Sequence, residues 1–332
     1  MKKPTLWQLA RGGTCPGALL SGRMRGGWRP ALLRRSAKTR ASDMFSYLIN
    51  RAALRSRLLR LKPIAAFRRR ASAARRRAFR ATTGISPAAR TVSAGVKEKG
   101  VHLLPEVTPL LGPGASVIAG LIARGSAAWD WAPGRDLLES DDILVRNADV
   151  YALGLDAVLL DLAEDYLGEP CFYMGCSLKR ERVSPSKGGT RQWHHDIEDD
   201  RLLRLIFYLN DVEEGGGPFQ YIDVAASRLA GSRLAYRSGY VGDAAMRSAI
   251  RDDSWTSVRG GAGLMIAFDG TRVFHRVSPP VSADRFSLSI TYSSRHPRQI
   301  LRQVRLRPAS RRRLLANLSD RERACLPGAR WS

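Results

Sequence analysis

The chain has 332 residues, of which 44% are hydrophobic, and only four cysteines, so it is long enough to bury a core without the disulfide framework of a small secreted domain. The formal net charge of +25 is unevenly distributed. Residues 1–100 carry 25 Lys/Arg and two acidic residues, residues 101–294 carry 19 and 26, and residues 295–332 carry 11 and two. A mildly acidic body therefore lies between a basic arm and a basic tail.

No apolar run reaches the roughly 18 to 20 residues that span a bilayer, and the longest candidate is the segment 115–123. The N-terminus lacks the apolar segment of a secretory signal. We therefore expect a cytoplasmic protein without a transmembrane segment, whose cysteines stay reduced. The Arg-rich, acid-poor N-terminus shares the composition of an organelle transit peptide, and this alternative stays open.

Residues 1–99 are predicted to form a basic arm that is partly disordered or amphipathic-helical. The segment 44–61, MFSYLINRAALRSRLLRL, places apolar residues on one helical face between arginines. Residues 44–80 could bind an anionic surface or an acidic carrier protein. Nucleic acid is the least supported partner, because no aromatic residues are interleaved as stacking platforms. The alternative is a solvated extension, with Met44 as the true start.

From Gly100 the pattern indicates a body that spans residues 100–295. The segment 100–111 predicts an entry strand or turn, and residues 149–168 predict one helix that Gly168 ends. Short β-rich runs separated by turn residues follow at 171–181, 202–212, 217–222, 261–270 and 285–294. A helix-leaning insert covers 225–252, and residues 296–332 form a basic tail whose segment 310–326 predicts a final helix. This order favours a mainly β fold with flanking helices.

The segment 191–200, RQWHHDIEDD, contains candidate metal ligands. In an extended segment alternate side chains share a face, so His194 and Asp196 point the same way and His195 points the other way. A third ligand must come from elsewhere, and His275 follows one predicted strand and precedes another. Two histidines and one carboxylate suit non-haem Fe(II) with open coordination positions.

The last predicted strand adds a candidate anion site. Arg285, Ser287, Ser289 and Thr291 share one face of the strand 285–294. A guanidinium can bind a carboxylate with two parallel hydrogen bonds, and a hydroxyl two residues later can add a third. A dicarboxylate co-substrate needs a site of this kind.

In this order, His194, Asp196, His275 and Arg285 resemble the phytanoyl-CoA dioxygenase-like family of Fe(II)/2-oxoglutarate-dependent oxygenases, and the resemblance covers roughly residues 100–295. It implies a double-stranded β-helix, a jelly-roll and cupin-like core, with iron held by both histidines and Asp196. It implies that Arg285 binds 2-oxoglutarate with help from Ser287, and that Gln192 is a further candidate for this site. The implied activity uses O2 to hydroxylate an unidentified small-molecule or acyl-type substrate, and releases succinate and CO2.

Two other functions remain open at this point. One is a non-oxidising, cupin-like metal-binding protein, and the other is an interaction protein that acts through its basic N-terminal arm. The remaining polar residues have simpler interpretations. Glu198, Asp199 and Asp200 are expected to form a solvated acidic turn, and Cys171 and Cys176 to be core residues on a strand.

Overall fold

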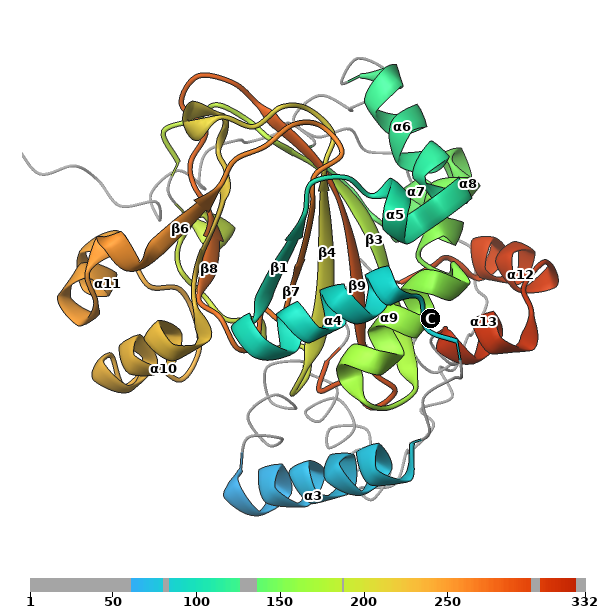
Figure 1. The fold of residues 1–332 in the computed structure, drawn as a ribbon, viewed down its shortest axis with the longest axis horizontal. Helices are drawn as coiled ribbons and strands as arrows, with labels where there is room; N and C mark the ends of the chain where they lie inside the picture. Colours follow the sequence, from blue (N-terminus) through green and yellow to red (C-terminus); the bar gives the residue numbers. More distant parts are fainter. Residues whose placement is uncertain (1–60, 80–83, 126–135, 187, 300–304, 327–332) are drawn as a thin grey trace, which may run out of the picture. The chain divides into compact units, whose positions relative to one another are not determined.

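The computed structural model describes residues 61–79, 84–125, 136–186, 188–299 and 305–326 (Figure 1). All of them belong to the unit that spans residues 49–332. The predicted amphipathic helix at 44–61 lies outside the described residues except for Leu61. None of the described helices has both the length and the hydropathy that crossing a bilayer requires.

The described strands form two antiparallel sheets. The larger sheet has the order β1-β7-β4-β9-β3-β2. Its strands are β1 (Val101–Leu104), β2 (Leu137–Leu138), β3 (Cys171–Glu181), β4 (Leu202–Tyr208), β7 (Met265–Phe268) and β9 (Arg285–Ser294). The smaller sheet has the order β6-β5-β8, with β5 (Phe219–Ile222), β6 (Trp255–Val258) and β8 (His275–Val277). The runs predicted at 171–181 and 285–294 match β3 and β9.

The chain alternates between the two sheets. After β3 in the larger sheet, His194 forms a bridge to His275 at the edge of the smaller sheet, and β4 then returns to the larger one. Strands β5 and β6 lie in the smaller sheet, β7 in the larger, β8 in the smaller and β9 in the larger. This winding of two facing antiparallel sheets is the double-stranded β-helix that the resemblance implies, so the predicted fold class is confirmed.

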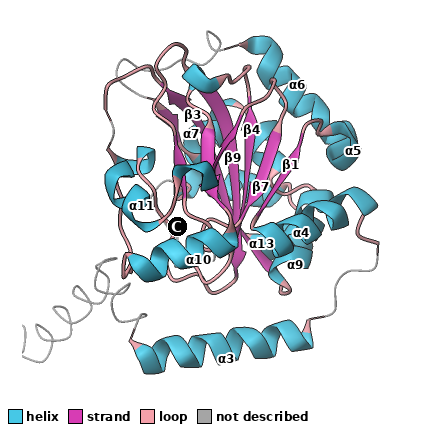
Figure 2. Ribbon diagram, turned by 60° about the vertical axis from the view of Figure 1, so that its left-hand side comes forward, coloured by secondary structure: helices cyan, strands magenta, loops and turns pink. Residues whose placement is uncertain are grey.

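Helices α4 to α9 cover the outer face of the larger sheet, and the main hydrophobic core lies between these helices and the sheet. Helices α4 and α9 lie on one side of the strands and α10 and α11 on the other (Figure 2). The helix bounds are α4 (Pro87–Lys99), α5 (Thr108–Leu111), α6 (Ala115–Arg124), α7 (Ser140–Arg146), α8 (Ala148–Leu153), α9 (Ala157–Leu167), α10 (Val224–Arg233) and α11 (Asp243–Ala249).

The side chains of β9 alternate between the hydrophobic core and the space between the two sheets. Leu288, Ile290 and Tyr292 are fully buried in the core under the helices. Arg285 and Ser287 point between the two sheets, where they line a cavity. The predicted alternation of this strand is therefore confirmed, because neighbouring side chains leave a strand on opposite faces.

Two predicted helices are each broken in two. The helix expected over 149–168 is the pair α8 and α9, because Asp156 caps the second helix by accepting a hydrogen bond from the Val158 N–H. The tail forms α12 (Pro308–Ala316) and α13 (Asp320–Cys325), and Ser319 and Glu322 form a capping box at the start of α13. Both predictions of a single helix were wrong for the same reason, an internal N-cap.

The arm contributes two described helices, α3 (Lys62–Ala78) and α4. In α4, Ala89, Val92 and Val96 are buried in the main core. In α3, Arg75 and Ser72 both bind Glu169, at 2.6 and 2.8 Å. The division of the chain at residue 100 stays a prediction. The hydrophobic core also includes residues of α4, which precede residue 100 in the sequence.

Candidate metal centre

His194, Asp196 and His275 are brought together at one edge of the smaller sheet. His194 and His275 pair through their backbones, and each N–H donates to the other carbonyl at 3.1 Å. One potential ligand atom from each of the three side chains lies within 4.8 Å of the other two. The predicted set of metal ligands therefore has two origins. His194 and Asp196 are two residues apart in the sequence, and the chain returns through β8 to bring His275 beside them.

The two imidazole rings are oriented by the backbone. The Nδ1 atom of His194 lies 2.9 Å from the Gln192 carbonyl, and that of His275 lies 3.2 Å from the Val273 carbonyl. A carbonyl oxygen only accepts, so each Nδ1 carries the proton and each Nε2 keeps a lone pair. The Nε2 of His275 is 3.7 Å from Asp196 Oδ1. In metal-binding histidines, one ring nitrogen commonly donates its N–H to a carbonyl in this way while the other nitrogen binds the metal.

The protonation states also suit a metal. Burial lowers the pKa of His275 to about 3 and also lowers the pKa of His194, so both rings are neutral near pH 7. Burial acts to raise the pKa of Asp196, but nearby positive charge, that of Arg204 above all, outweighs it and the net shift is downward. Neutral imidazoles and an ionised carboxylate are the forms that bind a divalent cation.

Asp196 occupies a close-fitting position. Its side chain is 7% exposed, and Oδ2 accepts no hydrogen bond from the described residues. Its N–H donates to the Gly270 carbonyl at 2.8 Å. A Cβ atom at Gly270 would overlap Asp196 Oδ2, so any larger residue there would have to displace the Asp196 side chain. Apart from its ion pair with Arg204, the buried Oδ2 atom has no partner among the described residues, which fits a carboxylate that binds a metal.

Arg204 is a member of the site that the sequence analysis did not single out. It lies on β4, and its Nε is 3.3 Å from Asp196 Oδ2 while its Nη2 donates to Glu198 Oε1 at 3.1 Å. The available signal was its position as the one charged residue in the apolar run LLRLIFY. A charge inside such a run must be paired, because burying an isolated charge costs several kcal/mol.

A cavity of about 230 Å³ lies between the sheets beside these residues. Arg285 is 2% exposed and donates through Nη1 to the Gly217 carbonyl at 3.0 Å. Its Nε is buried and has no acceptor among the described residues. Ser287 lines the same cavity and is 2% exposed. The further lining residues include Ser177, Lys179, Thr190, His194, Arg204, Phe219, His275 and Ser289. Arg285 can therefore bind an anion that enters this cavity.

The remaining candidates lie elsewhere. Gln192 does not line the cavity, and what it offers is the backbone carbonyl that orients His194. The ring of His195 packs against Phe274 and Tyr236, with centroid distances of 4.1 and 5.4 Å. It lines a separate cavity, which Asp196 also lines.

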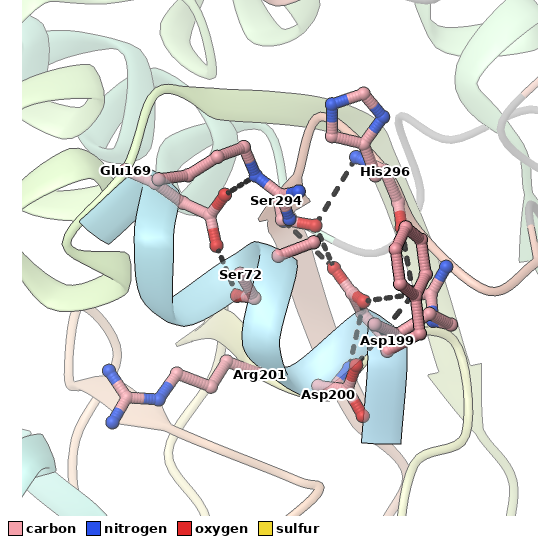
Figure 3. A pocket seen from close by; sticks show the side chains of 11 residues that line it. Ser72, Glu169, Asp199, Asp200, Arg201, Ser294 and His296 are labelled. Carbon is pink, nitrogen blue, oxygen red and sulfur yellow. Dashed lines mark hydrogen bonds and ion pairs between the residues drawn. The ribbon is translucent and has the colours of Figure 1, made fainter. Parts of the chain in front are cut away.

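The prediction of a solvated acidic turn at 198–200 was wrong for Glu198 and Asp199, whereas the side chain of Asp200 is 28% exposed. Glu198 and Asp199 are 4% and 2% exposed. Asp199 accepts hydrogen bonds from Ser294 Oγ at 2.6 Å and Ser294 N at 3.0 Å (Figure 3). It lies in a second cavity of about 210 Å³ beneath α3, together with Ser72 and Glu169 (Figure 3). The basic helix α3 places positive charges beside these acids. Without such counter-charges, buried carboxylates in the turn would be costly.

No protein-family model and no curated protein matches the chain. Solved structures that resemble it include the epimerase SnoN in complex with Fe3+ and alpha ketoglutarate, with 17% identity over 63% of this chain and 85% of that one, and a TM-score of 0.43. HygX from Streptomyces hygroscopicus, with nickel and 2-oxoglutarate bound, has 15% identity over 62% and 86%, and a TM-score of 0.41. EctD from S. alaskensis, with 2-oxoglutarate and 5-hydroxyectoine, has 19% identity over 64% and 78%, and a TM-score of 0.45. We base the proposed function on the side chains of this chain.

Proposed function

We propose that this chain is a non-haem Fe(II)- and 2-oxoglutarate-dependent dioxygenase. The observation that carries the proposal is the convergence of His194, Asp196 and His275 beside a cavity in which a buried guanidinium, that of Arg285, has an unused donor. A two-histidine, one-carboxylate set leaves open positions and suits Fe(II) chemistry with O2.

In this proposal the chain's own residues hold and orient the reactants. His194 and His275 present neutral Nε2 atoms, and Asp196 presents a carboxylate that Arg204 keeps ionised. Arg285 binds the distal carboxylate of 2-oxoglutarate, and the Ser287 hydroxyl adds a neutral hydrogen bond. When bound, iron and 2-oxoglutarate supply the oxidation of a C–H bond by O2, with release of succinate and CO2.

The finer assignments belong to the same proposal. The order of His194, Asp196, His275 and Arg285 along the chain supports the phytanoyl-CoA dioxygenase-like branch. Hydroxylation is the proposed outcome, because Asp196 occupies the carboxylate position and leaves no vacancy for a halide. The proposed substrate class is a small molecule or acyl-type compound that fits the cavity between the sheets.

An anaerobic Fe(II) titration of the full chain, followed by 2-oxoglutarate, tests the proposal. We expect one iron per chain and then a weak visible charge-transfer band, because the keto acid chelates the metal. Succinate release after admission of O2 is the second readout. Iron binding without a band or succinate would instead favour a non-oxidising metal-binding protein. Absence of iron binding would favour a protein that acts through its basic arm.

A further inference from the structure

Glu164, Cys171 and Cys325 form a second cluster of metal-binding side chains, separate from the site proposed for iron. Glu164 lies on α9, Cys171 begins β3 and Cys325 ends α13. All three side chains are buried, and one ligand atom of each lies within 4.8 Å of the other two. Both cysteines belong to the core under the helices, on the face of the larger sheet that points away from the cavity between the sheets.

The sulfur separation fits a shared metal ion. The Sγ atoms of Cys171 and Cys325 are 3.9 Å apart. A disulfide requires a bond of about 2.05 Å, so the two sulfurs would have to approach substantially. Two thiolates at about 2.3 Å from a tetrahedral zinc ion lie about 3.8 Å apart. The observed spacing therefore needs little adjustment to accommodate such an ion.

The carboxylate is held in a way that suits a third ligand. Oε2 of Glu164 forms an ion pair with Arg321 Nη2 at 3.1 Å. Oε1 has only a 3.5 Å contact with the Cys171 N–H. One oxygen is thus held by Arg321, and the other lies beside the backbone N–H of Cys171. Carboxylates that bind metals are commonly supported by such an outer hydrogen-bonding partner.

The chemistry of the donor set selects the type of ion. Thiolate and carboxylate ligands together are typical of zinc, which binds Cys, His, Asp and Glu in tetrahedral sites. Binding releases the two thiol protons, and the cation then neutralises charges that would be costly to bury alone. Arg321, which also pairs with Asp161, adds positive charge at the rim of the cluster.

We propose that Glu164, Cys171 and Cys325 bind one divalent cation of the zinc class, with a water as the fourth ligand. This ion joins three elements, because its ligands come from α9, β3 and the C-terminal helix α13. That helix has six residues and buries little else than Cys325 and the following Leu326. The ion therefore fastens the tail to the body, and its site is independent of the proposed oxygenase activity.

The test measures zinc in the reduced full-length chain after zinc loading and gel filtration. We expect about one tightly bound zinc in the double variant His194→Ala/His275→Ala, which removes the other candidate site, and up to two in wild type, which has both sites. Cys171→Ser or Cys325→Ser, added to this double variant, should remove the zinc. Cys176→Ser is the matched control, since Cys176 is a buried cysteine on the same strand but outside the cluster. It should keep the ion.

Cobalt provides a readout that needs no variant. Replacement of zinc by Co(II) in wild type should produce thiolate-to-cobalt charge-transfer absorption. Zinc that persists when Cys325→Ser is added to the His194→Ala/His275→Ala variant, or the absence of both zinc and this absorption in wild type, would overturn the proposal. A chain lighter by two hydrogens, with two fewer maleimide-reactive thiols, would identify a disulfide and overturn it as well. Succinate release by Cys325→Ser separates either failure from that of the oxygenase proposal.

Discussion

Arg204 and the buried Asp196 form an ion pair, with 3.3 Å between Nε and Oδ2, that joins β4 to the candidate metal ligand. Arg204 also pairs with Glu198, so one guanidinium is shared by two carboxylates. The remaining negative charge lies beside two neutral imidazoles. The pair thus sets the electrostatic environment of the proposed metal before any ion binds.

Replacing Arg204 by Met should destabilise the protein by about 3–5 kcal/mol, because two buried carboxylates lose their counter-charge. Urea denaturation at neutral pH measures the change in the free energy of unfolding. Arg251→Met is the control, because Arg251 pairs with Asp253 on the surface with 86% of its side chain exposed. Equal stability of the two variants would show that Arg204 is not the main counter-charge.

The ligand set can be tested by single substitutions to alanine. His194→Ala, Asp196→Ala and His275→Ala should each abolish stoichiometric Fe(II) binding, because two protein ligands do not suffice for a tight site. His195→Ala should keep iron, since its ring packs against Phe274 away from the ligands. Metal content after anaerobic gel filtration gives the answer. Loss of iron from His195→Ala with retention in His194→Ala would reverse the assignment of the two faces.

Arg285→Ala should weaken the apparent affinity for 2-oxoglutarate by about 30-fold or more, and Arg285→Lys should be intermediate. Removing one partner of a desolvated charge pair costs about 2–5 kcal/mol, which corresponds to this range. Iron binding should survive, because Arg285 is not a metal ligand. A titration of the Fe(II) protein with 2-oxoglutarate, followed by succinate release, measures the effect.

Ser287→Ala is the matched control for Arg285. It removes one neutral hydrogen bond from the same face of β9, so we expect a much smaller loss of affinity. An unchanged affinity in Arg285→Ala would remove the support for 2-oxoglutarate as co-substrate.

Asp199 should make stability depend on pH. Burial raises its pKa to about 6, above the value of about 3.9 in an unfolded chain. Between these values the folded state holds a proton that the unfolded state has released. The contribution of this protonation to the free energy of unfolding is therefore complete below pH 4, and it is lost as pH rises through 6.

The variant Asp199→Asn lacks this titration. Relative to it, wild type should lose up to about 3 kcal/mol between pH 4 and pH 7. Urea denaturation of both proteins at several pH values measures the difference. A constant difference across this range would show that Asp199 titrates normally.

Two glycine substitutions should have opposite effects on stability. A Cβ at Gly154, between α8 and α9, would overlap the fully buried ring of Tyr173, so Gly154→Ala should cost about 1–3 kcal/mol. Gly120 lies within α6 and has open space at this position, so Gly120→Ala should stabilise the protein by about 0.5–1 kcal/mol. Thermal unfolding compares the two. A Gly154→Ala variant as stable as Gly120→Ala would mean that Tyr173 can move aside.

The predictions that were confirmed rested on the local periodicity of the sequence. The two faces of β9 depend only on the period of a strand, so Arg285 and Ser287 could be separated from the core residues Leu288 and Ile290. The same rule placed His195 opposite His194. The choice of His275 as partner came from its position between two predicted strands.

Tertiary structure decided what depends on elements distant in the sequence. The pairing of Arg204 with Asp196, the burial of Asp199 under α3 and the approach of Cys325 to Cys171 each require the course of the whole chain. Such contacts leave no periodic signal, because each residue's neighbours in the sequence say nothing about the element packed against it. The sequence therefore determined the kinds of side chain on each strand face, and the winding of the two sheets determined which of them meet.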